Sequence, residues 1–80
     1  MTHYEVLGIR ENAKMDEIRQ AFRREAILWH PDRNRMPGAH ARICAINAAY
    51  EMLSDDASRR RYDVILQIRR MDKRKVEDRS

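Results

Sequence analysis

Residues 15–32 read MDEIRQAFRREAILWHPD and decide the fold, because they describe one amphipathic helix together with its end. The apolar positions of this helix recur at spacings of four, four and three residues: Ile18, Phe22, Ala26 and Trp29. Pro31 has no backbone N–H to continue a helix and disfavours helical geometry at the residue before it. The stretch therefore predicts a helix over residues 15–29 that buries one face and stops before the proline.

Residues 39–53 carry a second apolar stripe and predict a second long helix. Its members follow spacings of three, four and three residues: Ile43, Ile46, Tyr50 and Leu53. Residues 30–38 hold both prolines and one of the two glycines, which is typical of a loop. Two long helices with facing stripes and a loop between them indicate an antiparallel helical hairpin.

Shorter helices are expected at both ends of this hairpin. Thr2 can cap a first helix that Gly8 ends. Ser54 or Asp55 can cap a fourth helix that begins near Asp56. The predicted fold class is therefore all-α.

The composition agrees with one small helical domain. The chain has 80 residues, 42% hydrophobic and 38% charged, with only two glycines and two prolines. Cys44 is the only cysteine, which excludes an internal disulfide and a cysteine-based zinc cluster. No stretch approaches the ~20 apolar residues of a membrane helix, and the first residues lack the pattern of a signal peptide. We expect a soluble, cytoplasmic monomer that needs no cofactor.

The positive charge is concentrated near the C-terminus. The net charge is +4, and residues 59–80 hold nine basic and four acidic residues, a balance of +5 that leaves −1 for residues 1–58. Beyond Arg69 only Met71 and Val76 are apolar, so we expect residues 69–80 to form a basic tail that is frayed or disordered. The tail keeps open a second interpretation, a small basic helical module that binds nucleic acid or the ribosome.

His30, Pro31 and Asp32 stand at the joint of the predicted hairpin. As ordinary turn residues they would only stop a helix. Held on a loop between two packed helices, they would present an imidazole and a carboxylate rigidly to a partner, with little ordering entropy lost on binding. We do not expect catalysis, because no nucleophile, phosphate-binding loop or second carboxylate is near. We do not expect a metal site either, because His3 and His40 lack ligand spacing.

Arginines lie on both sides of this triplet. Arg19 and Arg23 are four residues apart and share a helix face, with Arg24 next to them, and Arg33 and Arg35 follow the triplet. Such residues usually form only a solvated surface. A basic helix face that leads to an exposed loop also suits docking on an acidic surface, whose charge would steer the encounter.

Four segments together resemble the J-domain of the DnaJ (heat-shock protein 40) co-chaperone family. They are HYEVLGI at 3–9, DEIRQAFRREAILWHPDRN at 16–34, INAAYEMLSD at 46–55 and RRRYD at 59–63. The resemblance covers residues 2–63. The triplet alone would be a weak signal, but its distance from the other three segments makes the combination highly specific.

The resemblance implies a J-domain over residues 1–68, in which helices II and III form the hairpin, an HPD loop joins them, and helices I and IV are short. It implies a co-chaperone, not itself an enzyme, that docks on the nucleotide-binding domain and linker region of a DnaK-type (heat-shock protein 70) chaperone. There it would stimulate ATP hydrolysis and so promote client capture and protein folding. The implied partner-binding residues are His30, Pro31, Asp32, Arg19, Phe22, Arg23, Arg24, Arg33 and Asn34.

A few residues depart from the family pattern. Lys14 stands where a Ser or Thr cap is common, which leaves only the Glu17 half of a capping box. Glu25 and Leu28 lower the positive charge of the docking helix. These two residues keep open a third interpretation, a degenerate J-like interaction domain that folds and binds without stimulating hydrolysis.

Overall fold

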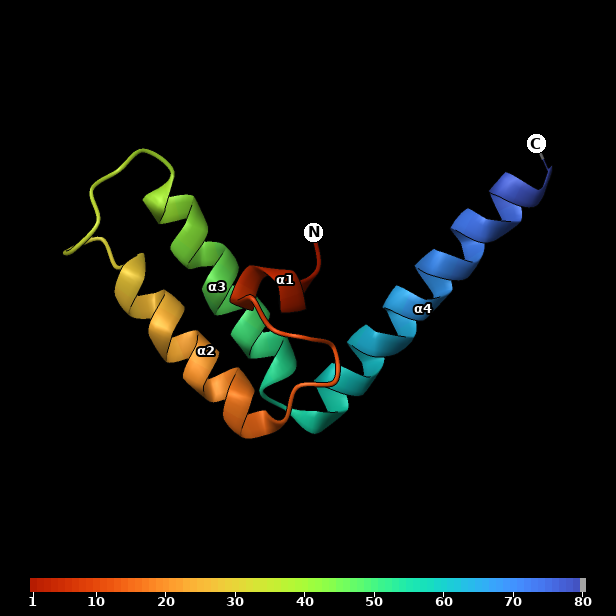
Figure 1. Ribbon diagram of the computed structural model, residues 1–80, viewed down its shortest axis with the longest axis horizontal. Coiled ribbons are helices and arrows are strands. Elements are labelled where there is room, and N and C mark those ends of the chain that lie inside the picture. Colours follow the sequence, from red (N-terminus) through yellow and green to blue (C-terminus); the bar gives the residue numbers. More distant parts are fainter. Residues whose placement is uncertain (80) are drawn as a thin grey trace.

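The computed structural model describes the backbone of residues 1–79 and the side chains of residues 1–71. This part of the chain contains four helices and no strand: α1 (His3–Leu7), α2 (Met15–Leu28), α3 (Ala39–Leu53) and α4 (Asp56–Arg79). Figure 1 shows α2 and α3 as an antiparallel pair, with α1 beside α3 and α4 leading away from the hairpin. The predicted all-α fold with a central helical hairpin is confirmed.

The two ends of α1 form as the sequence predicts. Thr2 Oγ1 accepts a hydrogen bond from the Glu5 N–H at 3.1 Å. Gly8 has a φ of 70°, a left-handed conformation that favours glycine, and its N–H donates to Glu5 O at 3.0 Å. These contacts define a helix that would be too short to persist in isolation.

Half of a capping box starts α2. Glu17 Oε1 accepts the Lys14 N–H at 3.5 Å, whereas the Lys14 ammonium has no acceptor to offer in return. At the other end Trp29 is the C-cap, not the last helical residue, and its N–H donates to Glu25 O at 3.0 Å. Pro31 therefore ends the helix one residue earlier than expected.

Asp55 caps α4. Its Oδ2 accepts the Ser58 N–H at 3.0 Å, whereas Ser54 closes α3 by donating its N–H to Tyr50 O at 2.8 Å. The hydrogen bonds from Ser58 lower the pKa of the Asp55 carboxyl, because they favour its charged form. Of the two candidate caps, the structure thus uses the second.

The core lies between α1, α2 and α3. Its largest fully buried side chains are Tyr4, Leu7, Ile18, Ile46 and Leu53. Ala21 and Ala49 are also buried, and their small side chains let α2 and α3 approach closely. Tyr62 and Leu66 extend this core along the inner face of α4.

The loop end of the hairpin is less buried than the apolar stripe predicts. Trp29 is only partly buried, because α1 packs against the halves of α2 and α3 that lie away from the loop. Phe22 stacks on Tyr50 with ring centroids 4.0 Å apart. The Arg42 guanidinium lies 5.4 Å from the centroid of the Trp29 ring. The Arg42–Trp29 pair joins α2 and α3 at the loop end, where α1 does not cover them, whereas the Phe22–Tyr50 pair lies closer to the other end of α3.

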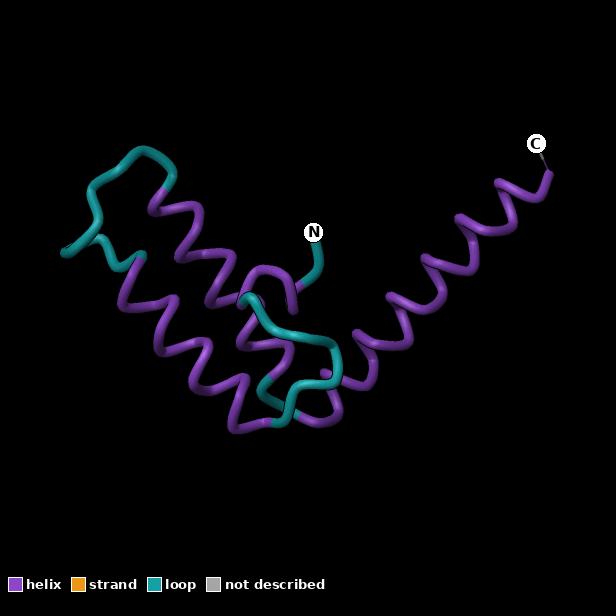
Figure 2. Tube along the Cα trace, viewed as in Figure 1, coloured by secondary structure: helices purple, strands orange, loops and turns teal. Residues whose placement is uncertain are grey.

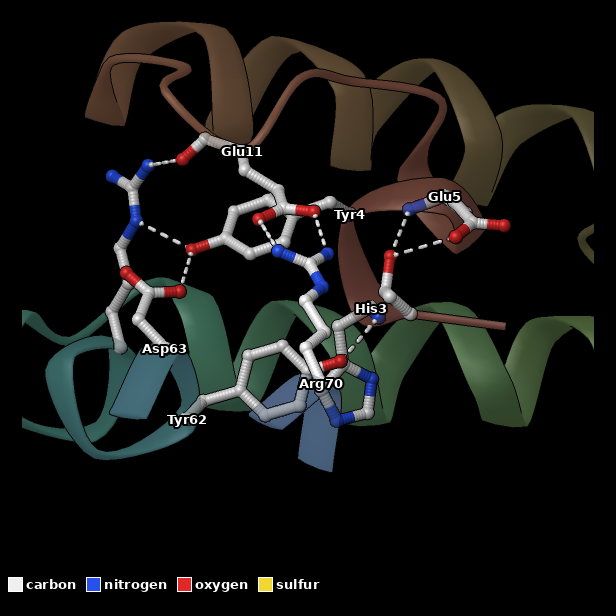
Figure 3. Close-up of polar contacts among 9 residues, drawn as sticks. His3, Tyr4, Glu5, Glu11, Tyr62, Asp63 and Arg70 are labelled. Atoms are coloured by element: carbon white, nitrogen blue, oxygen red, sulfur yellow. Dashed lines mark hydrogen bonds and ion pairs between the residues drawn. The ribbon is translucent and has the colours of Figure 1, made fainter. Parts of the chain in front are cut away.

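Arg59 joins the start of α4 to the N-terminal segment. Its guanidinium donates to Glu11 O at 3.1 Å and to Ala13 O at 2.6 Å, and its Nε donates to Tyr4 Oη at 3.1 Å. Tyr4 Oη in turn donates to Asp63 Oδ1 at 2.5 Å (Figure 3). Burial, followed by the bond to Asp63, raises the pKa of Tyr4, so this phenol stays protonated and able to donate.

Two further contacts run between α4 and the first eleven residues (Figure 3). Tyr62 Oη accepts the His3 N–H at 2.9 Å, and the two rings lie 4.5 Å apart. The Arg70 guanidinium binds both carboxylate oxygens of Glu11, at 3.1 and 2.5 Å, which lowers the pKa of Glu11. Residues 59–70 of α4 are therefore fixed to the rest of the domain by polar as well as apolar contacts.

Helix α4 is not short, as the sequence predicted, but the longest of the described helices: its 24 residues continue past residue 68 to Arg79. The expected boundary between a domain over 1–68 and a tail over 69–80 falls within this helix, and the separate character of the tail stays a prediction. The side chains of residues 72–80, on which part of that expectation rests, lie outside the described residues. No helix in the described part of the chain, α4 included, is both long and apolar enough to cross a membrane.

Arg59→Ala should destabilise the domain more than a typical arginine substitution. It removes the hydrogen-bond donor of two backbone carbonyls, those of Glu11 and Ala13, and a donor to the Tyr4 hydroxyl. We expect the free energy of unfolding to fall by about 2 kcal/mol or more, and the melting temperature by roughly 10 °C. Arg60→Ala is the matched control, since Arg60 is exposed on the same helix. Equal melting temperatures for the two variants would contradict the role assigned to Arg59.

The pKa of His3 lies below its ordinary value of 6.5, because burial disfavours the charged ring. The unfolded chain therefore takes up this proton more readily than the folded one. We therefore expect the free energy of unfolding to keep its full value above pH 6.5. It should decrease as the pH falls below 6.5, because the unfolded chain then binds the proton more tightly than the folded one. Denaturant unfolding at about pH 7.5 and about pH 5.5 measures the difference. His3→Gln should reduce it, while His40→Gln, on an exposed position of α3, should leave it unchanged.

Candidate functional site

The His30-Pro31-Asp32 triplet lies in the loop between α2 and α3, at the end of the hairpin away from α4 (Figures 1 and 2). His30 O accepts the N–H groups of Arg33 at 2.9 Å and Asn34 at 2.8 Å, so the chain turns immediately after the triplet. Proline at the second position fixes one backbone angle of this turn. The triplet is thus a turn and also an exposed corner of the molecule.

The side chain of His30 is oriented by its neighbour. His30 Nδ1 accepts the backbone N–H of Asp32 at 3.2 Å, a bond that requires Nδ1 without a proton and leaves Nε2 as the donor of the neutral ring. The Asp32 carboxylate lies 3.7 Å from the same nitrogen and is 90% exposed. The triplet therefore offers a positioned imidazole and a free carboxylate to a partner.

Asn34 fastens this loop to α2. Its Nδ2 donates to Leu28 O, one of the last carbonyls of the helix, at 3.2 Å, and its Oδ1 accepts the Met36 N–H at 3.1 Å. The sequence singled out Asn34 only as a partner-binding position. An asparagine in a turn commonly accepts the N–H two residues further along, so the Met36 bond was predictable from the sequence, whereas the bond to Leu28 O was not.

Glu25 has a partner within its own helix. Trp29 Nε1 donates to Glu25 Oε2 at 3.2 Å, one turn further along α2. The carboxylate that seemed to weaken the basic docking helix is therefore half-buried and partly occupied in positioning the tryptophan next to the triplet.

The basic residues of α2 lie on two sides of the helix. Arg19 and Arg23 border a small hollow of about 180 Å³. Arg19 also lies 4.0 Å from the exposed Asp16 carboxylate, and an exposed ion pair of this kind contributes little to stability. Arg24 points to the other side, where it lines an open depression of about 780 Å³ with residues of the 8–14 connector. The structure brings the first two arginines together and separates the third from them.

Phe22 is not a free surface residue, because its ring stacks on Tyr50 inside the hairpin. In contrast, Ile27 is 54% exposed and lines an apolar hollow of about 440 Å³ together with His30, Asp32 and Arg33. The sequence missed Ile27, although its place outside the buried stripe was the available signal. The hollow adds an apolar contact to the two polar groups of the triplet.

Comparisons with known proteins agree with this geometry. The family model for the DnaJ domain matches residues 2–63. The chain is 54% identical over 61 residues to the chaperone protein DnaJ of Roseiflexus sp. (strain RS-1). It is 51% identical over the same length to that of Dictyoglomus thermophilum. Each match covers 76% of this chain and 16% of the relative, so the chain spans less than a fifth of the proteins it matches.

Solved structures show the same fold. The J-Trx1 fragment of ERdj5 superposes with a TM-score of 0.75 at 44% identity, over 79% of this chain and 32% of that one. The matched residues include both helices of the hairpin and the loop between them. The family predicted from the sequence is confirmed, and membership supports a co-chaperone role. The chain belongs to the DnaJ domain family.

Proposed function

We propose that this domain docks on the nucleotide-binding domain and linker region of a DnaK-type (heat-shock protein 70) chaperone in the cytoplasm and stimulates its ATP hydrolysis. One observation carries the proposal. In a chain of the DnaJ domain family, His30, Pro31 and Asp32 stand at an exposed corner with a free carboxylate and an oriented imidazole. Docking through α2 and this corner would promote client capture and protein folding.

The fixed shape of the loop supports such a role. Backbone bonds to His30 O, the Asn34 bonds and the proline ring hold the loop in one conformation before any partner arrives. A preorganised loop loses little conformational entropy on binding, so more of the contact energy is available for affinity. Asp32 would then pair with an arginine of the chaperone.

The charge of α2 supports an acidic docking surface. Arg19 and Arg23 lie together on one exposed side of the helix, and Arg33 follows the triplet. Their charge would raise the rate of encounter with an acidic partner and fix its orientation. Ile27 and the hollow beside His30 would supply the apolar part of the contact.

The domain would act on the chaperone's conformational equilibrium, with no chemistry of its own. A ligand shifts a two-state equilibrium only through its different affinities for the two states. The docked loop would therefore bind the hydrolysing, client-trapping conformation of the chaperone more tightly than the resting one. Stimulation then depends on contacts that the loop makes in only one of these states.

His30→Gln should abolish stimulation and leave the fold intact, because the side chain is half exposed and contributes nothing to the core. The measurement is single-turnover ATP hydrolysis by a DnaK-type chaperone with the full chain added. His40→Gln, an exposed histidine outside the site, should stimulate like the wild type. Undiminished stimulation by His30→Gln, or a large drop in its melting temperature, would show that the role assigned here is wrong.

Asn34→Ala should loosen the loop and weaken docking without changing the maximal rate. Freeing a loop of this kind costs roughly 0.5–1.5 kcal/mol, so we expect the half-maximal concentration for stimulation to rise about 2- to 10-fold. Backbone amides of the loop should exchange faster in the same variant. Asn34→Asp, which loses only the bond to Leu28 O, should lie between. Asn47→Ala, exposed on α3, serves as the control, and wild-type behaviour of Asn34→Ala would contradict the clamp.

A further inference from the structure

The outer face of α4 exposes a row of apolar side chains. Val64 is 53% exposed, Ile65 45%, Ile68 51% and Met71 62%. Tyr62 and Leu66, on the opposite side of the same helix, are buried against the hairpin. We use "outer face of α4" for six residues: Arg60, Arg61, Val64, Ile65, Ile68 and Met71.

The spacing on this face is that of a helix-packing seam. The apolar positions 64, 68 and 71 follow steps of four and three residues, which is the repeat by which two helices pack side by side. Arg60, Arg61, Val64 and Ile65 line an apolar hollow of about 390 Å³. Two arginines thus border a row of apolar side chains with an open depression that side chains of another helix can enter.

The J-domain fold does not account for this face. The DnaJ domain match ends at residue 63, immediately before the first of the four apolar side chains. The exposed row packs against no other described helix, and it lies at the end of the molecule away from the triplet (Figure 1). A partner on the outer face and a chaperone at the loop would therefore not compete for the same surface.

The charge around the apolar row indicates which kind of partner fits this face. The outer face itself carries two arginines, Arg60 and Arg61, and no acid. Arg70, outside this face, already binds Glu11, and the one acid among residues 60–71, Asp63, accepts a hydrogen bond from Tyr4. A second copy of this face would bring its arginines against like charges. A membrane surface is a poorer match, because helices that lie in the lipid interface commonly carry tryptophan or phenylalanine on the apolar face, and the exposed row has no aromatic side chain. An amphipathic helix with acidic flanks matches both the seam and the charge.

We propose that the outer face of α4 binds an amphipathic, acidic helix of a partner protein other than the DnaK-type chaperone. The partner's apolar residues pack between Val64, Ile68 and Met71, and its carboxylates pair with Arg60 and Arg61. A contact confined to a few helical turns is small, so we expect a dissociation constant on the order of micromolar, typical of a transient complex. This inference does not depend on stimulation of ATP hydrolysis.

A synthetic peptide tests the proposal with the full chain. The probe is a fluorescent peptide of about three heptads, with leucine at the seam and glutamate at the flanks, whose like charges also disfavour its own dimerisation. A second peptide carries lysine in place of glutamate. We expect fluorescence anisotropy to show saturable binding of the acidic peptide and at least about 10-fold weaker binding of the basic one.

Variants locate the binding site. Ile68→Ser should weaken binding of the acidic peptide about 10-fold or more, whereas Leu28→Ser, equally exposed at 56% but on α2, should leave it unchanged. Arg60→Glu combined with Arg61→Glu should reverse the preference in favour of the basic peptide. His30→Gln should bind the acidic peptide like the wild type, and Ile68→Ser should still stimulate ATP hydrolysis, which separates this proposal from the previous one.

Several outcomes would overturn the proposal. No saturable binding, equal affinity for both peptides, or binding that Ile68→Ser leaves unchanged would each exclude it. A concentration-dependent dimer in sedimentation that Ile68→Ser dissociates would identify a second copy as the occupant instead. Binding to vesicles containing anionic lipid, lost in Ile68→Ser and stronger than peptide binding, would identify a membrane surface.

Discussion

The packing of α1 and α4 on the hairpin depends on one side chain, that of Arg59. The guanidinium of Arg59 binds the Tyr4 hydroxyl and two backbone carbonyls of residues 8–14, which connect α1 to α2. The Tyr4 hydroxyl in turn donates a hydrogen bond to Asp63. Since a short helix and an irregular connector have few hydrogen bonds of their own, this cation satisfies groups that neither segment can satisfy internally. It thereby fixes α1 over the hairpin, completes the core, and sets the direction in which α4 leaves.

Core and site lie at opposite ends of the hairpin. The largest fully buried side chains gather where α1 adds a third helix, while near the loop the Arg42 guanidinium on the Trp29 ring joins α3 to α2. The triplet is therefore kept in place by short-range bonds within the loop, and its side chains stay free of the core. This division lets surface residues of the loop change without loss of the fold, and lets the loop present polar groups that a core could not accommodate.

Periodicity and turn residues predicted most of this fold, because helix ends and apolar stripes are local features. The four helices, the Thr2 and Gly8 ends of α1 and the half capping box at Glu17 followed from single residues and their spacing. The contacts of Arg59 and Arg70 could not be predicted, since they join residues 46 to 59 positions apart in the sequence and no local pattern records them. For the same reason the partial exposure of Trp29 could not be predicted, because it depends on where α1 packs and not on the α2 sequence. Ile27 is different, since its place outside the buried stripe of α2 already indicated that it is exposed.

Helix α4 also acts as a rigid spacer. Its 24 residues extend about 36 Å, and it is anchored as far as residue 70 through Tyr62, Leu66 and Arg70. A protein seated on its outer face would not sample the volume that a flexible tether allows. Its effective concentration near a chaperone held at the loop would be set by geometry alone, high if the two surfaces lie within reach of each other and negligible if they do not.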